Sequence, residues 1–313
     1  MKLRRSARAA LVTLLLPVGL LAVPVQAHAA GPSDADLAYR WAPVHYQDSA
    51  SGHYSADYLS RVDYDGDWNT LNNWENLDAD PARLTGTAYY SVVETSTHWY
   101  LTYAFYHPRD WKISSHENDM EGVVEVVLKD GSTYGTLQAA VTQAHDNYYS
   151  YIPAGSPFQG NRENIDGTLL MENHDGAQHP TVFQEAKGHG MYNWSGGSFP
   201  GGDGIVYRPS RTAGTVPTGG NDRAASYQLV DIFSSGGLWE RRDAKPPYAS
   251  WGTFAGDNGK DNAAHTPWAW DDTNDGSDLQ AGSIAGDPAY LIGQYFKNTG
   301  TFSLSYTRNA YRP

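Results

Sequence analysis

Short aromatic and β-branched runs, separated by Gly, Asn, Asp and Ser, recur along this chain of 313 residues. Such runs favour strands because these side chains pack well on a pleated sheet, and the residues between them favour turns. The segment 99–105 alternates most clearly, with Trp99, Leu101, Tyr103 and Phe105 on one face. We therefore expect a mostly β fold, a single-domain β-sandwich with a few peripheral short helices and long loops.

Seven segments are the clearest strand candidates: 87–93, 99–105, 122–128, 136–143, 181–186, 204–207 and 302–307. Three segments favour short helices instead: 34–41, 227–233 and 289–296. Ser33 or Asp34 can cap the first helix, and Asp287 with Pro288 suits the start of the third. Long glycine-rich loops are expected at 153–164, 194–202 and 210–221.

The first 29 residues have the pattern of a secretory signal peptide. Four basic residues within the first eight positions precede an apolar stretch, and the small residues Ala27 and Ala29 suit a signal peptidase. We expect cleavage after Ala29 and a secreted mature domain over residues 30–313. A membrane anchor is the alternative, but the stretch is short for a span of about 20 residues and two prolines interrupt it. No later segment is apolar enough to span a bilayer.

Charge and cysteine content exclude several classes of protein. The chain has 22 Lys and Arg against 35 Asp and Glu, so its formal charge is −13; loss of the four basic residues of the signal makes this −17. We expect no nucleic-acid binding, since phosphate contacts need a basic face. The chain has no cysteine, which excludes disulfides, Cys-ligated metal sites and a thiol nucleophile.

A polar connection between two apolar strands carries the residues best suited to chemistry. Asp110 ends the first strand, His116 lies in the connection, and Asp119 and Glu121 begin the second strand. Strand residues two apart point to one side, so pairing of the strands would bring all four side chains together. This set suits a divalent cation, first Mg²⁺ or Ca²⁺, with Mn²⁺ or Zn²⁺ as alternatives. A solvated acidic loop is the other interpretation.

These residues resemble the central signature of the necrosis-inducing, NLP-type secreted proteins. Residues 106–110 read Y-H-P-R-D and residues 115–121 read S-H-E-N-D-M-E, similar to the Y-x-P-K-D segment and the G-H-R-H-D-W-E heptad of that family. Residues 144–149 look like its A-H-G-G-Y segment. The resemblance implies a β-sandwich with a divalent cation in a surface cavity, held directly or through partners by the four residues above. It also implies a further histidine, best matched by His189.

Several positions depart from the family pattern. Ser115, Glu117, Asn118 and Met120 replace Gly, Arg, His and Trp of the heptad, and the cysteine pair common in the family is absent. The resemblance therefore carries metal binding better than the cytolytic activity of toxic members, which bind plant sphingolipid head groups. Segments 40–46, 63–68, 72–76, 179–182 and 188–192 also resemble vacuolar protein sorting-associated relatives.

Four other residues could belong to the site. His107 and Glu117 border the cluster and are expected beside the ligands. His145 follows a strand and could be a ligand, a general base or a surface histidine. His189 lies between two glycines, which permit close approach of the backbone to a ligand.

Two further patterns have alternative readings. Asp63, Asp65 and Asp67 alternate as in a calcium loop, but position 74 is Trp where an EF-hand needs Glu, so a turn is favoured. Aromatic residues in turn-rich segments suit core packing, or sugar stacking where they are exposed. Segment 266–272, with Trp268 and Trp270, is the best exposed candidate.

The leading hypothesis is a secreted, NLP-like β-sandwich that binds a divalent cation and recognises a glycan or glycolipid head group, in a cytolysin- or virulence-type role. The alternative is a metal-dependent extracellular hydrolase with Glu121 or His145 as general base. A third reading is an envelope protein whose cation serves folding alone. The chain lacks the His-Glu-x-x-His, Gly-x-Ser-x-Gly and P-loop motifs.

Overall fold

The computed structural model describes residues 31–274, 276 and 279–312. The expected signal peptide, 1–29, lies outside these residues. Pro32–Pro313 forms one compact unit. Its helices are α1 (Asp34–Trp41), η1 (Tyr54–Asp57), α2 (Asn73–Ala79), η2 (Pro81–Arg83), α3 (Ser283–Gly286) and α4 (Pro288–Tyr295). Within the described residues, none of the helices has the length and apolarity needed to cross a membrane.

The strands account for most of the regular structure, which confirms the predicted mostly β fold. They are β1 (Val44–Asp48), β2 (Thr87–Thr95), β3 (His98–Asp110), β4 (His116–Leu128), β5 (Thr136–Ala144), β6 (Asn147–Pro153), β7 (Gln159–Gly160), β8 (Ile165–Leu169), β9 (Met171–His174), β10 (Ala177–Gln184), β11 (Met191–Asn193), β12 (Gly204–Ser210), β13 (Ala225–Asp231), β14 (Tyr248–Ser250), β15 (Thr253–Phe254), β16 (Phe296–Lys297) and β17 (Tyr306–Arg308).

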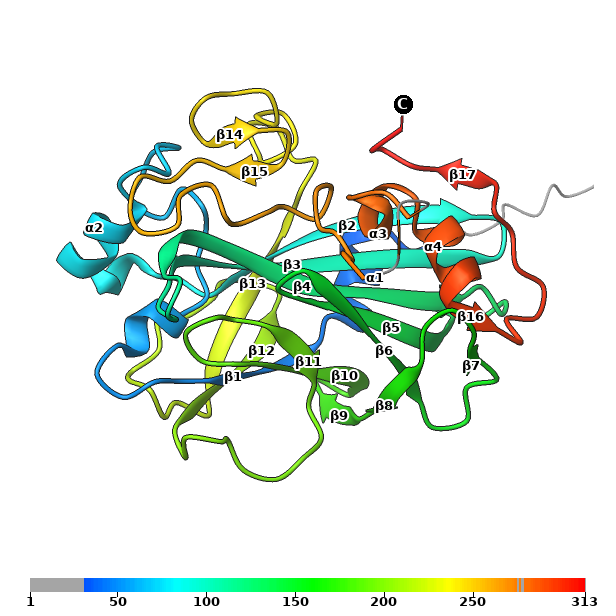
Figure 1. Ribbon diagram of the computed structural model, residues 1–313. Coiled ribbons are helices and arrows are strands. Elements are labelled where there is room, and N and C mark those ends of the chain that lie inside the picture. The colour runs from blue at the N-terminus through cyan, green and yellow to red at the C-terminus, as the bar shows by residue number, and fades with distance from the viewer. Residues whose placement is uncertain (1–30, 275, 277–278, 313) are drawn as a thin grey trace, which may run out of the picture. The chain divides into compact units, whose positions relative to one another are not determined.

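Among the described residues, one mixed sheet of 13 strands forms the body of the unit (Figure 1). Its main path runs β11-β10-β1-β12-β13-β2-β3-β4-β5-β6-β8, with β9 and β17 attached beside it. The sheet curls until its ends approach: Asn193 of β11 donates a side-chain hydrogen bond to the Thr168 carbonyl of β8 at 2.9 Å. The curl gives the nearly closed sheet an inner and an outer face.

The long hairpin of β3 and β4 is packed on both faces. Leu101, Tyr103 and Phe105 of β3 join the inner core with Val123 of β4. The intervening residues of both strands join a second core, which the C-terminal third of the chain covers. Each face removes aromatic and branched side chains from water, and this burial provides the main stabilisation of the sheet. Cores on both sides hold the two strands rigidly, and the strands end together at Asp110 and His116.

Two helix predictions are confirmed and one is wrong. Helix α1 has the expected bounds, and Ser33 Oγ accepts a hydrogen bond from the Asp36 N–H at 3.1 Å. Helix α4 begins with Pro288 at its first position, as expected. Residues 227–231 of the segment expected as a helix at 227–233 belong to strand β13, because β12 and β2 flank it in parallel and supply backbone partners on both sides, and the last two residues lie in a turn. Tertiary pairing therefore overrides the local helical pattern.

Two expectations near the C-terminus need correction. Of the strand expected at 302–307, only Tyr306 and Thr307 lie in β17, whose register against β2 is irregular. Trp268 and Trp270, expected to be exposed, are 4% and 1% exposed. The Nε1–H of Trp270 donates to the Met120 carbonyl of β4 at 2.8 Å, so this segment packs down onto the sheet.

Candidate metal centre

The hairpin register brings the predicted site residues to one end of the sheet. Asp110 pairs with His116, and His107 pairs with Asp119. No pair forms at Pro108, which has no backbone N–H, and Asn118 opposite it adopts φ 59°. The Asn118 side chain is fixed by hydrogen bonds that include one from the Tyr106 hydroxyl at 2.6 Å. This local break in the strand sets the direction of the neighbouring carboxylate.

Asp110, His116 and Asp119 form a compact group of buried ligand atoms. One atom from each residue lies within 4.8 Å of the others. The His116 Nδ1–H donates to the Asn118 carbonyl at 2.9 Å, and its Nε2 lies 3.4 Å from Asp110 Oδ2. Since a carbonyl can only accept, Nδ1 carries a proton, and Nε2 is the nitrogen that can bind a cation once its own proton has left. A backbone carbonyl orients ligating histidines in many metal sites in this way.

Burial and neighbouring polar groups together set the charge states of His116 and Asp110. Burial is the largest single influence and opposes charge on both His116 and Asp110, but their mutual hydrogen bond and the nearby opposite charges together outweigh it. The pKa of His116 is consequently raised above its usual value, and the pKa of Asp110 is lowered. The Lys112 backbone N–H also donates to Asp110 Oδ1 at 2.5 Å. The site therefore favours a negative Asp110 carboxylate facing a positive partner.

Glu121 lies two residues beyond Asp119 on β4 and is not part of the three-residue group. Its Oε1 accepts the His145 backbone N–H at 2.8 Å, while its buried Oε2 has no hydrogen-bond partner among the described residues. Burial raises the pKa of Glu121 well above its usual value, and the negative charge of Asp119 adds to this effect. A buried carboxylate oxygen without a donor is a group that a cation or a bound hydroxyl could satisfy.

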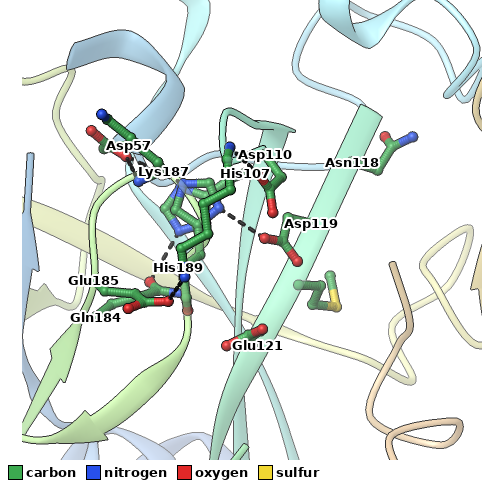
Figure 2. Close-up of polar contacts among 12 residues, drawn as sticks. Asp57, His107, Asp110, Asn118, Asp119, Glu121, Gln184, Glu185, Lys187 and His189 are labelled. Atoms are coloured by element: carbon green, nitrogen blue, oxygen red, sulfur yellow. Dashed lines mark hydrogen bonds and ion pairs between the residues drawn. The ribbon is translucent and has the colours of Figure 1, made fainter. Parts of the chain in front are cut away.

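His189 lies beside the group, held between two buried carboxylates (Figure 2). Its Nδ1 is 2.9 Å from Asp119 Oδ2, and its Nε2 is 3.4 Å from Asp57 Oδ1. Burial acts to lower the pKa of His189, but the two carboxylates outweigh it and raise the pKa to about 10. Both ring nitrogens are directed at carboxylates, so His189 contacts the three-residue group through Asp119.

His107 stacks on His189 from the other side. The two rings are parallel within 2°, with centroids 3.8 Å apart. Burial, and then the positive charge of His189, lower the pKa of His107 well below its usual value. Gln184 links the pair, because its Oε1 accepts from His107 Nε2 at 3.0 Å and its Nε2 donates to the His189 carbonyl at 2.7 Å. His107 thus supports the imidazolium without reaching the group itself.

A cavity of about 470 Å³ opens over the three-residue group. Its lining combines Asp110, His116, Asp119 and Glu121 with polar residues and with the apolar residues Ile113, Met120 and Trp270. The rim is formed by His145 and Lys112, which both contact Glu185; His145 Nε2 lies 2.8 Å from Glu185 Oε1. The same histidine places Nδ1 3.4 Å from Glu121 Oε1. The cavity thus has an acidic floor and a rim of paired charges.

Glu117, predicted to border the cluster, does not line this cavity. Its two carboxylate oxygens accept the backbone N–H groups of Trp74 at 3.1 Å and Asp257 at 2.9 Å. The left-handed backbone at Asn118 interrupts the alternation that would place Glu117 on the face of Asp119 and Glu121. Glu117 therefore fastens two loops to the start of β4.

Three residues of this region were not found from the sequence. Asp57 lies in η1 and contacts His189 far along the chain, so no local pattern signals it. Glu185 directly follows β10, within a segment predicted only as a strand. Lys112 lies between Asp110 and His116, and its position inside the motif was the one available signal.

The donor set fits a divalent cation. Two carboxylates and one imidazole Nε2 converge from two strands, and a further carboxylate oxygen without a donor lies in the same cavity. Such mixed oxygen and nitrogen donors suit Mg²⁺, Ca²⁺, Mn²⁺ or Zn²⁺. Without a positive ion, the buried carboxylates of Asp119 and Glu121 repel one another: burial is the main cause of the raised pKa of Glu121, and the charge of Asp119 adds to it.

Comparisons with known proteins found similarity to solved structures only. No family model and no curated protein matches the chain. The similar structures include Necrosis and Ethylene inducing Protein 2 from the causal agent of cocoa's Witches Broom disease, at 18% identity and a TM-score of 0.33, covering 54% of this chain and 73% of that one. A structure described as a toxin fold as basis for microbial attack and plant defense has 16% identity and a TM-score of 0.35, covering 76% of this chain and 88% of that one.

A third similar structure is NLPPya in complex with glucosamine, at 17% identity and a TM-score of 0.34, covering 67% of this chain and 79% of that one. These structures belong to the group that the hairpin motif resembles. The chemistry of this site follows from the geometry of Asp110, His116 and Asp119.

Proposed function

We propose that this chain is an exported, NLP-like protein that binds a divalent cation and recognises the sugar head group of a glycan or glycolipid. The convergence of Asp110, His116 and Asp119 below an open cavity carries this proposal. These three residues would hold the ion, and Glu121 would complete the acidic floor. A bound cation would supply a positive centre to which sugar hydroxyls can bind.

The cavity lining supports a sugar more than a purely apolar ligand. Hydrogen-bonding side chains, among them Gln143 and Lys260, share the wall with Trp270 and Met120. Sugars present hydroxyl groups at their edge and C–H groups on their faces, so they need a lining of this mixed kind. The cavity volume of about 470 Å³ lies in the usual range for small-ligand sites.

His189 has a supporting role in this proposal. Its two contacts, to Asp119 and Asp57, fix the carboxylate of Asp119 from behind. Partners of this kind orient metal ligands, and their loss commonly weakens metal binding by about 10- to 100-fold. His189 would therefore affect the cation through Asp119, in place of the direct ligation that the family resemblance implies.

Calorimetric titration with glucosamine and mannosamine, with Ca²⁺ or Mn²⁺ and again after EDTA, tests this function. These two sugars are bound in similar solved structures and serve as first probes. We expect a component of sugar binding that requires the cation and that Asp119→Asn removes. The matched control Asp65→Asn changes a carboxylate outside the cavity and should keep this component.

Two results would overturn the proposal. One is sugar affinity that changes less than twofold when the cation is added. The other is an Asp119→Asn variant that binds both cation and sugar as the unchanged protein does.

A second candidate, a metal-dependent hydrolase, is favoured by one observation. His145 lies at the cavity rim with one ring nitrogen 3.4 Å from Glu121 and the other 2.8 Å from Glu185. A histidine between two carboxylates can take up and release a proton. Turnover of a glycoside or phosphoester library, lost in His145→Ala while the cation stays bound, would support this candidate over pure recognition.

A further inference from the structure

A second pocket, lined by aromatic rings, shares no lining residue with the cavity of the candidate metal centre. Four rings define this aromatic pocket: Trp239, Trp251, Trp268 and Tyr311. They come from the loop after β13, the turn between β14 and β15, the segment before α3, and the C-terminal segment after β17. Its volume is about 170 Å³, below the range of drug-sized sites, so it suits a ligand of about one ring.

The rings are held at fixed angles. Trp239 meets Trp251 at 77° with centroids 5.6 Å apart, and it meets Trp268 and Tyr311 at 89° at 5.3 Å and 5.1 Å. Edge-to-face contacts of this kind stabilise a cluster beyond the area that it buries. The cluster therefore forms a rigid support for any group that contacts its outer rings.

Trp251 is the exposed member of the cluster. Its side chain is 52% exposed, whereas Trp268 is 4% exposed. It lies between β14 and β15 at the tip of a short hairpin, directly before Gly252, whose φ is 67°. Core packing explains the buried rings but leaves the exposed ring unexplained. A rigid aromatic surface at the mouth of a small pocket is suited to stacking a flat ligand face.

Charged neighbours decide which ligand fits. The Arg312 side chain lines the pocket, and the Arg242 guanidinium lies 4.7 Å from the centre of the Trp239 ring. Two positive groups disfavour a quaternary ammonium ligand, which would otherwise suit an aromatic cluster. Arg312 pairs with Asp287 through one Nη at 2.9 Å and keeps further N–H donors, while the Ser283 hydroxyl, which donates to the Gln280 carbonyl at 2.5 Å, can accept a hydrogen bond beside the rings. A neutral ring with apolar faces and hydroxyl edges satisfies all these features.

We propose that the aromatic pocket is a metal-independent binding site for a single neutral sugar ring, which stacks on Trp251 and hydrogen-bonds to Arg312 and Ser283. The site is distinct from the candidate metal centre. Trp268 lines the aromatic pocket and Trp270 lines the metal-site cavity, so the segment that carries both residues separates the two pockets. No ligand atom of the proposed cation site belongs to the aromatic pocket.

Saturation-transfer NMR with methyl glucoside, methyl galactoside and N-acetylglucosamine, recorded in EDTA, tests this proposal. We expect at least one of the three to bind, and Trp251→Ala to weaken it about tenfold or more, because the stacking surface is lost. Tyr290→Ala is the matched control, since Tyr290 is an exposed aromatic residue on α4 that does not line the pocket.

Asp119→Asn should leave this EDTA-resistant binding unchanged, which separates the outcome from that of the proposed metal-dependent function. Thermal melting of Trp251→Ala checks that the variant folds, and Trp251→Phe should retain part of the affinity. The proposal is overturned if none of the three sugars binds in EDTA, if Trp251→Ala binds as well as the unchanged protein, or if choline binds more tightly than every sugar.

Discussion

Two groups of carboxylates in this chain have similar sequence patterns and different environments. Asp63, Asp65 and Asp67 lie in a turn, where Arg61 pairs with Asp63 at 2.8 Å and the Asn69 N–H donates to Asp67 Oδ1 at 2.7 Å. The group at the sheet end, Asp110 and Asp119 with Glu121, is 3–6% exposed. Its members come from two strands and converge on one cavity.

The difference between them lies in where each carboxylate finds its partners. The turn uses its own backbone and nearby side chains, as in Asp65 Oδ1, which accepts the Asp67 N–H at 3.2 Å. In the group at the sheet end, Asp110 also accepts from the nearby Lys112 N–H, but Asp119 and Glu121 rely on His189 and His145 from distant segments, and one oxygen of Glu121 has no donor among the described residues. Spacing alone therefore does not identify a cation site; a deficit of positive partners in a cavity does.

The largest expected effect concerns His189, the positive partner behind the group at the sheet end. His189→Asn would leave the carboxylates of Asp57 and Asp119 buried without the positively charged imidazole ring that contacts both. Asn tolerates the positive φ of 54° at this position. We expect the free energy of unfolding to fall by about 3–5 kcal/mol, as in other broken buried pairs. Guanidinium denaturation measures it, with His174→Asn as control; a loss below about 1 kcal/mol would contradict this role.

Removal of the cation comes second. A cation at about 100 times its Kd adds about 2.7 kcal/mol of stability, which EDTA should remove. Asp119→Asn should abolish the difference between melts with and without EDTA, and Asp65→Asn should retain it. If Asp65→Asn, and not Asp119→Asn, loses the difference between melts with and without EDTA, the turn and not the sheet end binds the cation.

Glu125 on β4 adds a third case to the comparison, because its carboxylate is buried but does not line the cavity of the candidate metal centre. It is 0% exposed, and neither oxygen has a partner among the described residues. Burial raises the pKa of Glu125 well above its usual value, and the charge of Arg40 opposes this. The folded state keeps the proton that the unfolded state releases, so this group makes stability fall as pH rises above the unfolded pKa of about 4.3.

Glu125→Gln should remove that pH dependence. Relative to the unchanged protein, the variant should gain up to about 1.4 kcal/mol of stability per pH unit between the unfolded and folded pKa values of Glu125. Denaturation from pH 5 to 8 measures the gain, with the exposed Glu240→Gln as control. Equal slopes for the variant and the unchanged protein would show that Glu125 is ionised in the fold.

The smallest effect is expected in the turn. Asp67→Ala removes one exposed hydrogen bond, to the Asn69 N–H, and should cost about 0.5–1.5 kcal/mol with no change in cation affinity. Thermal denaturation and a Ca²⁺ titration check the two parts. A weakened Ca²⁺ affinity would make this turn a cation site after all.

Local patterns predicted part of this molecule and contacts between distant segments decided the rest. The alternation in β3 and β4 predicted that Asp110, His116, Asp119 and Glu121 would meet if the two strands pair; the strands do pair, and the first three residues form the compact group. The contact of Asp57 with His189 depends on how the sheet curls, which no local pattern shows. The pairing of β13 with β12 and β2 also depends on contacts between distant segments. The helix prediction at 227–233 was wrong because no local pattern shows this pairing.

The most direct test of the cation site is an anomalous-difference map from a crystal of the protein soaked in Mn²⁺. We predict one strong peak at about 2.0–2.4 Å from carboxylate oxygens of Asp110 and Asp119 and from Nε2 of His116. A map without density at this position, or with its only peak at the turn of Asp63, Asp65 and Asp67, would contradict the account.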